Sequence, residues 1–349
     1  MGDARQRRAT RLDAGQGMSA LLLSADDVRT HLSPRDCLRA VEAAFRASRA
    51  GAAHAPAPMH LEGEGGGVHA KGAVLRVGEA LYAAVKVNAN FPGNPERCGL
   101  PTVQGVVVLT DARNGALLAL IDSGALTALR TAAASALAAR HLARKDAGVL
   151  AIIGCGAQAA PHVTAIAAVR RISLGFAVDR DAERARRFAA RMTTVYGIDF
   201  EPLATPAAAA RQSDLIVTST TASAPILDAG DVAPGAFVAA VGADHPYKNE
   251  IAPALMAAAR VVADSLPQCL AMGDLHHAVA AGAMAAGDVH GELADILTGA
   301  REGRSRDDEI FVFDSTGSAL QDVAAAAFLY ERARARPQTT FDFARSPTV

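Results

Sequence analysis

Hydrophobic and polar positions follow two different patterns along the chain, and the change between them falls near residue 145. Between residues 24 and 50 the pattern predicts two helices, each preceded by a serine that is suited to cap a helix start. Residues 52–94 are rich in glycine and proline and contain β-like runs such as "LYAAVKVNAN". Two apolar runs that flank the turn sequence "DARNG" predict a β-hairpin over residues 102–122. This part of the chain is therefore expected to combine helices with antiparallel strands.

After residue 145, short apolar strands alternate with helical segments. We expect strands at residues 148–154, 171–179, 198–202, 214–220, 236–242, 260–264 and 309–315, and helices at residues 158–169, 181–192 and 318–336. Strand–helix alternation predicts a parallel, doubly wound sheet with right-handed crossovers. The predicted fold class is therefore α/β, with a Rossmann-type sheet.

The alanine-rich stretch "LTALRTAAASALAAR", residues 126–140, predicts one helix with a buried face. Leu126, Leu129, Ala133 and Leu137 belong to that face, because they recur at steps of three and four residues. Arg130 lies on or beside the same apolar stripe. A buried guanidinium is costly unless it meets an anion. We therefore expect an anion next to Arg130.

Composition narrows the possible classes of protein. The chain has 35 basic and 36 acidic residues, and this balance argues against nucleic acid or an anionic membrane as its main partner. The four cysteines lie far apart without CxxC spacing, so we expect buried, reduced thiols in a cytoplasmic protein. Residues 147–169 are uncharged, but their Gly, Pro, Gln and His favour a buried strand followed by a helix over a membrane span. Residues 1–17 are polar and basic, which predicts a disordered leader, with a basic targeting arm as the alternative.

The segment "IIGCGAQA" carries a dinucleotide fingerprint, Gly154-x-Gly156-x-x-Ala159, between a predicted strand and a predicted helix. The two glycines permit a tight turn and close approach of a pyrophosphate, and Ala159 allows the helix to pack closely on the sheet. The helix start offers unpaired N–H groups to the phosphates. Asp179 ends the next strand and is suited to bind the adenosine ribose, which favours NAD. The adjacent Arg180 leaves NADP possible.

Two further positions are candidates for chemistry. Lys86 interrupts a run of small apolar residues in a predicted strand, where it either binds an anion or extends to solvent. Asp244 directly follows a strand of the parallel sheet, at the edge where such sheets bind ligands, although an Asp there can also cap a turn. The pairs His60/His69 and His276–His277 lack the spacing of known metal motifs, so we expect no metal.

Five segments together resemble the ornithine cyclodeaminase/mu-crystallin family. They are "VKVNANFPGNPERCGLPTVQG", "LIDSGALTALRTAAASALAARHLAR", "IIGCGAQA", "VGADHPYK" and "FDSTGSALQDVAAAA". They occur in the family's order and span most of the chain. The resemblance implies a dinucleotide domain, residues 146–314, inserted into a second α+β domain for substrate binding and dimerisation, residues 18–145 with 315–340. It also implies a homodimer.

The resemblance implies a set of site residues as well. Lys86 and Arg130 would hold the α-carboxylate of a small amino or imino acid, and Asp244 would handle the amine or its proton. The implied cofactor contacts, added to the fingerprint residues Gly154 and Gly156 and to Asp179 and Arg180, are Thr102, Arg130, Ala157, Gln158, Thr218, Ser219, Thr220, Val241, Lys248 and Ser315.

Two positions depart from the cyclodeaminase pattern. Where cyclodeaminases carry an arginine as a third carboxylate ligand, "APAPMHL" offers Met59 or His60, and where they carry a glutamate this chain has Lys71. Lys71 would repel the side-chain ammonium of ornithine by about 1–4 kcal/mol at close range, and would suit a short, polar or acidic substrate side chain. Lys71 extending to solvent is the alternative. His60 and Lys71 are thus expected substrate contacts.

These observations favour an NAD(P)-dependent enzyme that transfers hydride to or from the α-carbon of a small amino or imino acid. One transfer makes it an imine reductase or amino-acid dehydrogenase. Transfer out and back, with loss of ammonia between, makes it an ornithine cyclodeaminase. A nucleotide-dependent binding protein of mu-crystallin type is the alternative from a different class. The presence of Lys86, Arg130 and Asp244 together favours catalysis, since binding alone needs no positioned acid or base.

Overall fold

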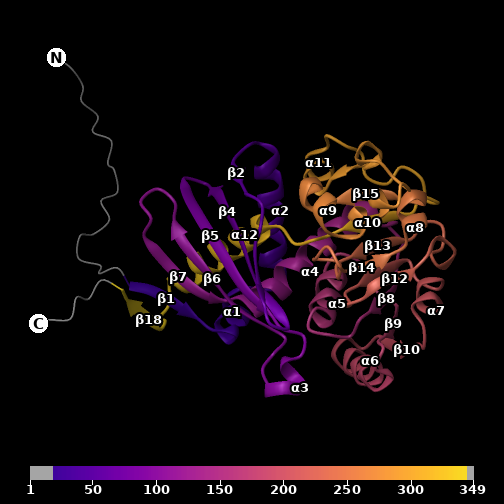
Figure 1. The fold of residues 1–349 in the computed structure, drawn as a ribbon, viewed down its shortest axis with the longest axis horizontal. Coiled ribbons are helices and arrows are strands. Elements are labelled where there is room, and N and C mark those ends of the chain that lie inside the picture. The colour runs from indigo at the N-terminus through magenta and orange to yellow at the C-terminus, as the bar shows by residue number, and fades with distance from the viewer. Residues whose placement is uncertain (1–18, 344–349) are drawn as a thin grey trace, which may run out of the picture.

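The structure is a computed structural model that describes residues 19–343, so the expected disordered leader lies outside the described residues. Two eight-stranded sheets stand side by side, with helices packed against both (Figure 1). We call them the mixed sheet and the parallel sheet. The combination confirms the α/β fold class expected from the sequence. No helix in residues 19–343 is long and apolar enough to cross a membrane.

The mixed sheet is built from both ends of the described chain. Its spatial order is β18 (Thr340–Asp342), β1 (Ser19–Leu23), β7 (Leu117–Asp122), β6 (Val103–Asp111), β5 (Ala80–Asn90), β4 (Gly66–Val77) and β2 (Ala53–His54), and β3 (Met59–Gly63) also pairs with β4. The expected hairpin is β6 and β7, and Gly115 in its turn has a φ of 77°. The accompanying helices are α1 (Ala25–His31), α2 (Pro34–Arg49), α3 (Asn94–Cys98), α4 (Ser123–Leu142) and α12 (Ala319–Ala333).

The two faces of the mixed sheet differ in character because successive strand residues point to opposite sides. The inner face, toward α4 and α12, carries a polar row contributed by β3, β4 and β5: His60, His69, Lys71, Lys86 and Asn88. Register places Lys71 directly opposite Lys86, and His69 between His60 and Asn88. The outer face is apolar and includes exposed side chains of Met59, Leu61 and Val85.

The parallel sheet confirms the predicted doubly wound arrangement. Its spatial order is β10 (Asp199–Pro202), β9 (Leu174–Val178), β8 (Val149–Ile153), β11 (Leu215–Thr218), β13 (Phe237–Ala240), β17 (Phe311–Asp314), β15 (Arg260–Ala263) and β16 (Gly291–Glu292). All its neighbouring pairs are parallel. The order runs backward along the chain from β10 to β8 and forward from β8 to β13, and β17 lies between β13 and β15. A separate parallel pair joins β12 (Ser223–Leu227) to β14 (Asn249–Ile251).

Helices cover the parallel sheet on both sides (Figure 1). They are α5 (Ala159–Ala167), α6 (Ala182–Tyr196), α7 (Pro206–Ala210), α8 (Pro253–Ala258), α9 (Leu266–Ala271), α10 (Asp274–Ala280) and α11 (Leu293–Thr298), with short 3₁₀ turns η1 (Ala229–Asp231) and η2 (Ala286–Asp288). The uncharged segment 147–169 forms β8 and α5, as the sequence predicted.

Helix α4 links the two sheets, and one expectation about it was wrong. We expected a single buried face, but residues 130–139 are buried around the whole helix. The reason is that α4 contacts α2, α12 and β6 of the mixed-sheet part on one side, and α5, β13 and β17 on the other. Its alanines allow this close packing, because small side chains let neighbouring elements approach from every direction. The position of α4 brings Arg130 to the boundary between the two sheets.

Candidate active site

The inner face of the mixed sheet holds a buried cluster of ionic groups. Arg130 comes from α4, Lys86 from β5 and Asp322 from α12, and they are 4%, 6% and 1% exposed. The Asp322 carboxylate accepts a hydrogen bond from Arg130 Nε at 2.8 Å, and Lys86 Nζ lies 2.9 Å from its other oxygen. Arg130 Nη1 also donates to Gln321 at 3.0 Å. The anion next to Arg130 is thus Asp322, a residue of the protein itself. From the sequence we expected the carboxylate of a substrate at this position.

Lys71 extends the cluster toward the parallel sheet. Its Nζ donates to the carbonyl oxygens of Thr316 and Gly317, both at 3.1 Å, in the segment between β17 and α12. Asp264 holds this segment by accepting hydrogen bonds from the backbone N–H groups of Thr316 and Gly317 and from the Gln321 side chain. The sequence left open whether Lys71 extends to solvent, and the structure directs it inward.

Three cations lie close together in this cluster. Arg130 and Lys86 share the Asp322 carboxylate at 2.8 and 2.9 Å, whereas Lys71 interacts electrostatically with Asp244, Asp322 and Asp264. Burial, reinforced by the charge of Arg130, lowers the pKa of Lys86 to about 7 although Asp322 opposes the shift. Burial also lowers the pKa of Lys71. A further anion placed here would therefore be attracted, and would raise the pKa of Lys86 again.

Asp244 approaches the cluster from the parallel sheet, on the loop between β13 and β14. Its carboxylate forms an ion pair with Lys248 at 2.6 Å, and about half of its side chain is exposed. Burial raises the pKa of Asp244, but the charges of Lys248 and Lys71 outweigh that effect, so the net pKa is lowered. Lys71 interacts electrostatically with Asp244 on one side and with Arg130 and Asp322 on the other. Asp244 is therefore an ionised carboxylate facing the cationic cluster.

The fingerprint loop between β8 and α5 contains one glycine that the backbone requires and one that lies beside open space. Gly154 has a φ of 98°, and a Cβ there would lie 2.7 Å from the carbonyl oxygen of Ser219, so glycine is required. A Cβ at Gly156 would meet nothing within 4 Å, which leaves open space beside the backbone. Asp179 at the end of β9 accepts from the Cys155 backbone N–H at 2.9 Å and is thereby held beside the loop.

A buried glutamate, Glu250, organises the neighbouring strand ends. It accepts hydrogen bonds from the Thr218 hydroxyl at 2.7 Å and from the backbone N–H groups of Thr220 and Gly242 at 2.6 and 2.7 Å. The Thr218 hydroxyl, expected at the cofactor, is therefore engaged within the protein. Ser219 also faces inward and donates to the Gly154 carbonyl at 3.2 Å. Glu250 thus joins the carboxyl ends of β11 and β13, the edge at which open α/β sheets bind ligands.

The remaining expected cofactor contacts come from strand ends, from the start of α5 and, for Thr102, from the mixed-sheet part. Val241 and Ser315 are buried at the ends of β13 and β17, where the Ser315 backbone N–H donates to Ala240. Ala157 is exposed and Gln158 partly exposed at the start of α5, and Arg180 is exposed after Asp179. Thr102 comes from the mixed-sheet part, just before β6, and its carbonyl accepts from the Phe91 N–H.

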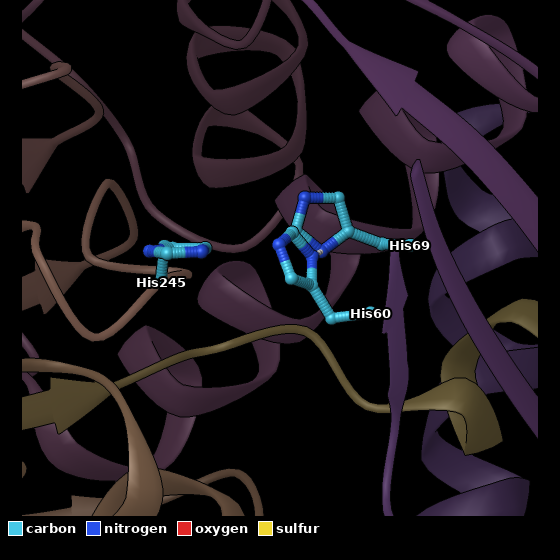
Figure 2. A group of neighbouring side chains, drawn as sticks. All are labelled: His60, His69 and His245. Atoms are coloured by element: carbon cyan, nitrogen blue, oxygen red, sulfur yellow. Dashed lines mark hydrogen bonds between the residues drawn. The ribbon is translucent and has the colours of Figure 1, made fainter. Parts of the chain in front are cut away.

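Three histidines meet beside Asp244. His60 on β3 and His69 on β4 are register partners, and their Nδ1 atoms are 2.9 Å apart. His245 approaches from the β13–β14 loop, with ring centroids 5.5 and 5.7 Å from those of His60 and His69 (Figure 2). His60 was an expected substrate contact, but its nearest polar partners are His69 and, at 3.0 Å, Glu62. The pair His276–His277 instead hydrogen-bonds to backbone carbonyls.

Sequence reasoning did not select three buried acids of this region: Asp322, Glu250 and Asp264. Gln321 and Asp322 are polar residues at the start of an otherwise apolar, alanine-rich helix. This was a usable signal, because a buried acid and a buried amide need hydrogen-bonding partners. The four cysteines are free thiols, as expected, but Cys98 is exposed while the other three are buried.

Comparison with known proteins supports this description. The family model of the ornithine cyclodeaminase/mu-crystallin family matches residues 18–336. An archaeal alanine dehydrogenase, solved as a dimer with bound NAD, superposes with a TM-score of 0.88 and 35% identity, covering 93% of this chain and 99% of that one. The Δ1-pyrroline-2-carboxylate reductase of Thermococcus litoralis, solved with NADH and L-proline, gives 0.86 and 32%, covering 90% and 98%. The iminosuccinate reductase of Paracoccus denitrificans, solved with NAD⁺, gives 0.82 and 31%, covering 91% and 97%.

Proposed function

The chain belongs to the ornithine cyclodeaminase/mu-crystallin family, and we propose that it is an NAD-dependent imine reductase or amino-acid dehydrogenase, with NADP as a possible second cofactor. It transfers hydride to or from the α-carbon of a small amino or imino acid. The solved relatives named above are dehydrogenases and reductases that carry NAD, NADH or NAD⁺.

The observation that carries this proposal is the buried excess of positive charge. Arg130 and Lys86 share one carboxylate, Asp322, and Lys71 adds a third cation beside them. Two buried cations that share a single carboxylate are not fully neutralised by it, so the pair of Arg130 and Lys86 favours a ligand that brings a second carboxylate. An α-carboxylate between Lys86 and Arg130 would meet charge-assisted donors on both sides. Every amino or imino acid substrate supplies that group.

The fingerprint loop fits the dinucleotide. Gly154 and Gly156 would let the backbone approach the pyrophosphate, the start of α5 would supply N–H donors, and Asp179 would accept from the ribose hydroxyls. When bound, the nicotinamide would supply the hydride for imine reduction or accept it in amino-acid oxidation. Within the protein, Lys86 and Arg130 orient the α-carbon by holding the carboxylate, and Asp244 faces the substrate nitrogen. An ionised Asp244 stabilises a protonated imine or amine nitrogen and exchanges its proton.

The substrate side chain distinguishes this proposal from cyclodeamination. Lys71 points toward the cluster instead of solvent. The side-chain ammonium of ornithine would meet like charge there, whereas a short, polar or acidic side chain would not. Ornithine cyclodeaminase is therefore the second candidate, and a nucleotide-dependent binding protein of mu-crystallin type the third.

The outer face of the mixed sheet supports a homodimer. Met59 and Leu61 on β3 are each 53% exposed and Val85 on β5 is 44% exposed, all on one apolar face. An uncovered apolar sheet face of this kind marks an interaction surface. We assign it to a second copy of the chain, in line with the dimeric alanine dehydrogenase. Free thiols at all four cysteines fit a cytoplasmic location.

The test is an assay of NADH and NADPH oxidation with a panel of 2-oxo acids plus ammonia or methylamine, and a separate assay of ornithine for proline formation. We expect oxidation with a small 2-oxo acid and at most slow conversion of ornithine. The variant Arg130→Lys keeps the charge but loses the planar fork, so KM should rise while NADH binding persists. Arg113→Lys, on an exposed pair with Asp111, is the matched control. NADH binding without turnover of any substrate would favour a binding protein.

A further inference from the structure

We propose that His60, His69 and His245 form a binding site for Zn²⁺, which links the β3–β4 strands to the β13–β14 loop. The site is separate from the cluster of Arg130, Lys86 and Asp322 and from the fingerprint loop. Its three imidazoles come from two parts of the chain, with His60 and His69 in contact and His245 facing them from the β13–β14 loop, as Figure 2 shows.

The distances between the three rings are compatible with a shared metal ion. One ligand nitrogen from each ring can be chosen so that all three lie within 4.8 Å of one another. Two nitrogens bound at about 2.1 Å to one zinc ion are separated by roughly 3.0–3.4 Å. The Nδ1 atoms of His60 and His69 are already 2.9 Å apart. Only His245 has to approach, and it stands on a loop whose neighbours Asp244 and Tyr247 are exposed.

The surroundings of His60 resemble those of a metal-bound imidazole. Metal-ligating histidines usually donate their second N–H to a carboxylate, which fixes the tautomer and strengthens the ligand. His60 directs Nδ1 toward His69 while its Nε2 lies 3.0 Å from a Glu62 oxygen. Glu62 would therefore fix the proton on Nε2 and leave Nδ1 free to bind the ion.

Charge also favours a cation here. Glu62 and Asp244 are the nearest carboxylates, and Lys71 and Lys248 are the nearest cations. Lys248 is paired with Asp244, and Lys71 is bound to backbone carbonyls. Imidazole ligands suit zinc, copper and nickel, and three histidines with an open position are a recurrent zinc arrangement.

Zinc at this position would hold the β13–β14 loop against the mixed sheet. The loop carries Asp244 and Lys248, so the ion would fix the carboxylate that faces the substrate nitrogen. This assigns His60, expected as a substrate contact, to metal binding. It also assigns a metal to a chain in which sequence spacing suggested none.

The experiment measures Zn²⁺ binding to the full chain without a histidine tag, by competition with a chromophoric chelator. We expect one ion per chain. His245→Gln and His69→Gln should weaken binding by more than the roughly 10–100-fold that loss of a second-shell partner costs, and Glu62→Gln should weaken it within that range. His54→Gln removes an exposed histidine of the same sheet and is the matched control. Co²⁺ in place of zinc should give visible absorption typical of low coordination that disappears in His245→Gln.

Three outcomes would overturn the proposal. One is the absence of Zn²⁺ binding tighter than millimolar, and another is binding that His54→Gln weakens as much as His245→Gln does. The third is that His69→Gln raises KM for a dicarboxylic substrate in zinc-free enzyme while the wild type binds no metal. That result would show that the histidines receive a substrate carboxylate. The first two outcomes are read from metal binding alone, so they test the zinc site independently of the enzymatic proposal.

Discussion

The substitution Asp322→Asn tests the central claim about the ionic cluster. Asp322 is the carboxylate that Arg130 and Lys86 share at 2.8 and 2.9 Å, and all three side chains are almost fully buried. Removing one partner of a buried ion pair costs about 3–5 kcal/mol, because an uncompensated charge remains. The amide of asparagine can still accept from Arg130, which places the expected loss near the lower end, about 3 kcal/mol.

The loss should depend on pH in a direction that Lys86 determines. The folded-state pKa of Lys86, about 7, lies below its ordinary value of 10.5. Lys86 therefore binds fewer protons in the folded than in the unfolded state between pH 7 and 10.5, and its contribution to stability rises across that window. Without Asp322 the folded-state pKa falls further. A fall of one unit makes the loss about 1 kcal/mol larger at pH 6 than at pH 9.

The assay is urea unfolding of the wild type and the variant at pH 6 and pH 9. The control is Asp26→Asn, which breaks an exposed pair with Arg29 of similar length, 2.6 Å, and should cost less than about 1 kcal/mol. KM for the amino or imino acid should also rise in Asp322→Asn, because Arg130 and Lys86 lose the group that positions them. A loss no greater than that of the control, or one that grows with pH, would refute the reasoning.

Four further predictions follow from the same contacts. Substrate affinity, measured as 1/KM, should fall as pH rises above about 7, because Lys86 must be protonated to hold a carboxylate. Lys86→Arg should flatten this pH profile, and an unchanged profile would exclude Lys86 as a ligand of the substrate carboxylate. NADH should bind more tightly than NADPH in a fluorescence titration because of Asp179, and tenfold tighter NADPH binding would contradict this. Gly317→Ala should lower the free energy of unfolding in urea by about 1–2 kcal/mol and raise KM, because φ at Gly317 is 76° and the new Cβ would lie 2.7 Å from Arg130 Nη1. An unchanged KM would argue against substrate binding by Arg130. Lys71→Glu should depress turnover of the natural substrate and admit ornithine, whereas efficient proline formation by the unmodified enzyme would identify a cyclodeaminase.

Much of the fold could be predicted from the sequence, because the signals involved are local. Strand–helix alternation after residue 145 predicted the parallel sheet, and turn chemistry predicted the β6–β7 hairpin. The fingerprint glycines predicted the β8–α5 loop, where a positive φ at Gly154 admits no other residue. Each of these features depends on residues close together in the chain, so periodicity and turn preferences are sufficient. The insertion of β17 between β13 and β15 was not predictable in this way, since it depends on packing of the completed sheet.

The sequence by itself determined that Arg130 needed an anion, and only the tertiary structure decided which one. Asp322 lies 192 residues further along the chain and reaches Arg130 because α12 returns to pack against α4. Likewise, the pairing of β4 with β5 places Lys71 opposite Lys86, and a shift of one residue would turn both to the other face. The His60, His69 and His245 cluster needs both that sheet and a loop from the other one. Local sequence sets which side chains an element carries, whereas strand register and helix packing, set by long-range burial, decide which of them meet.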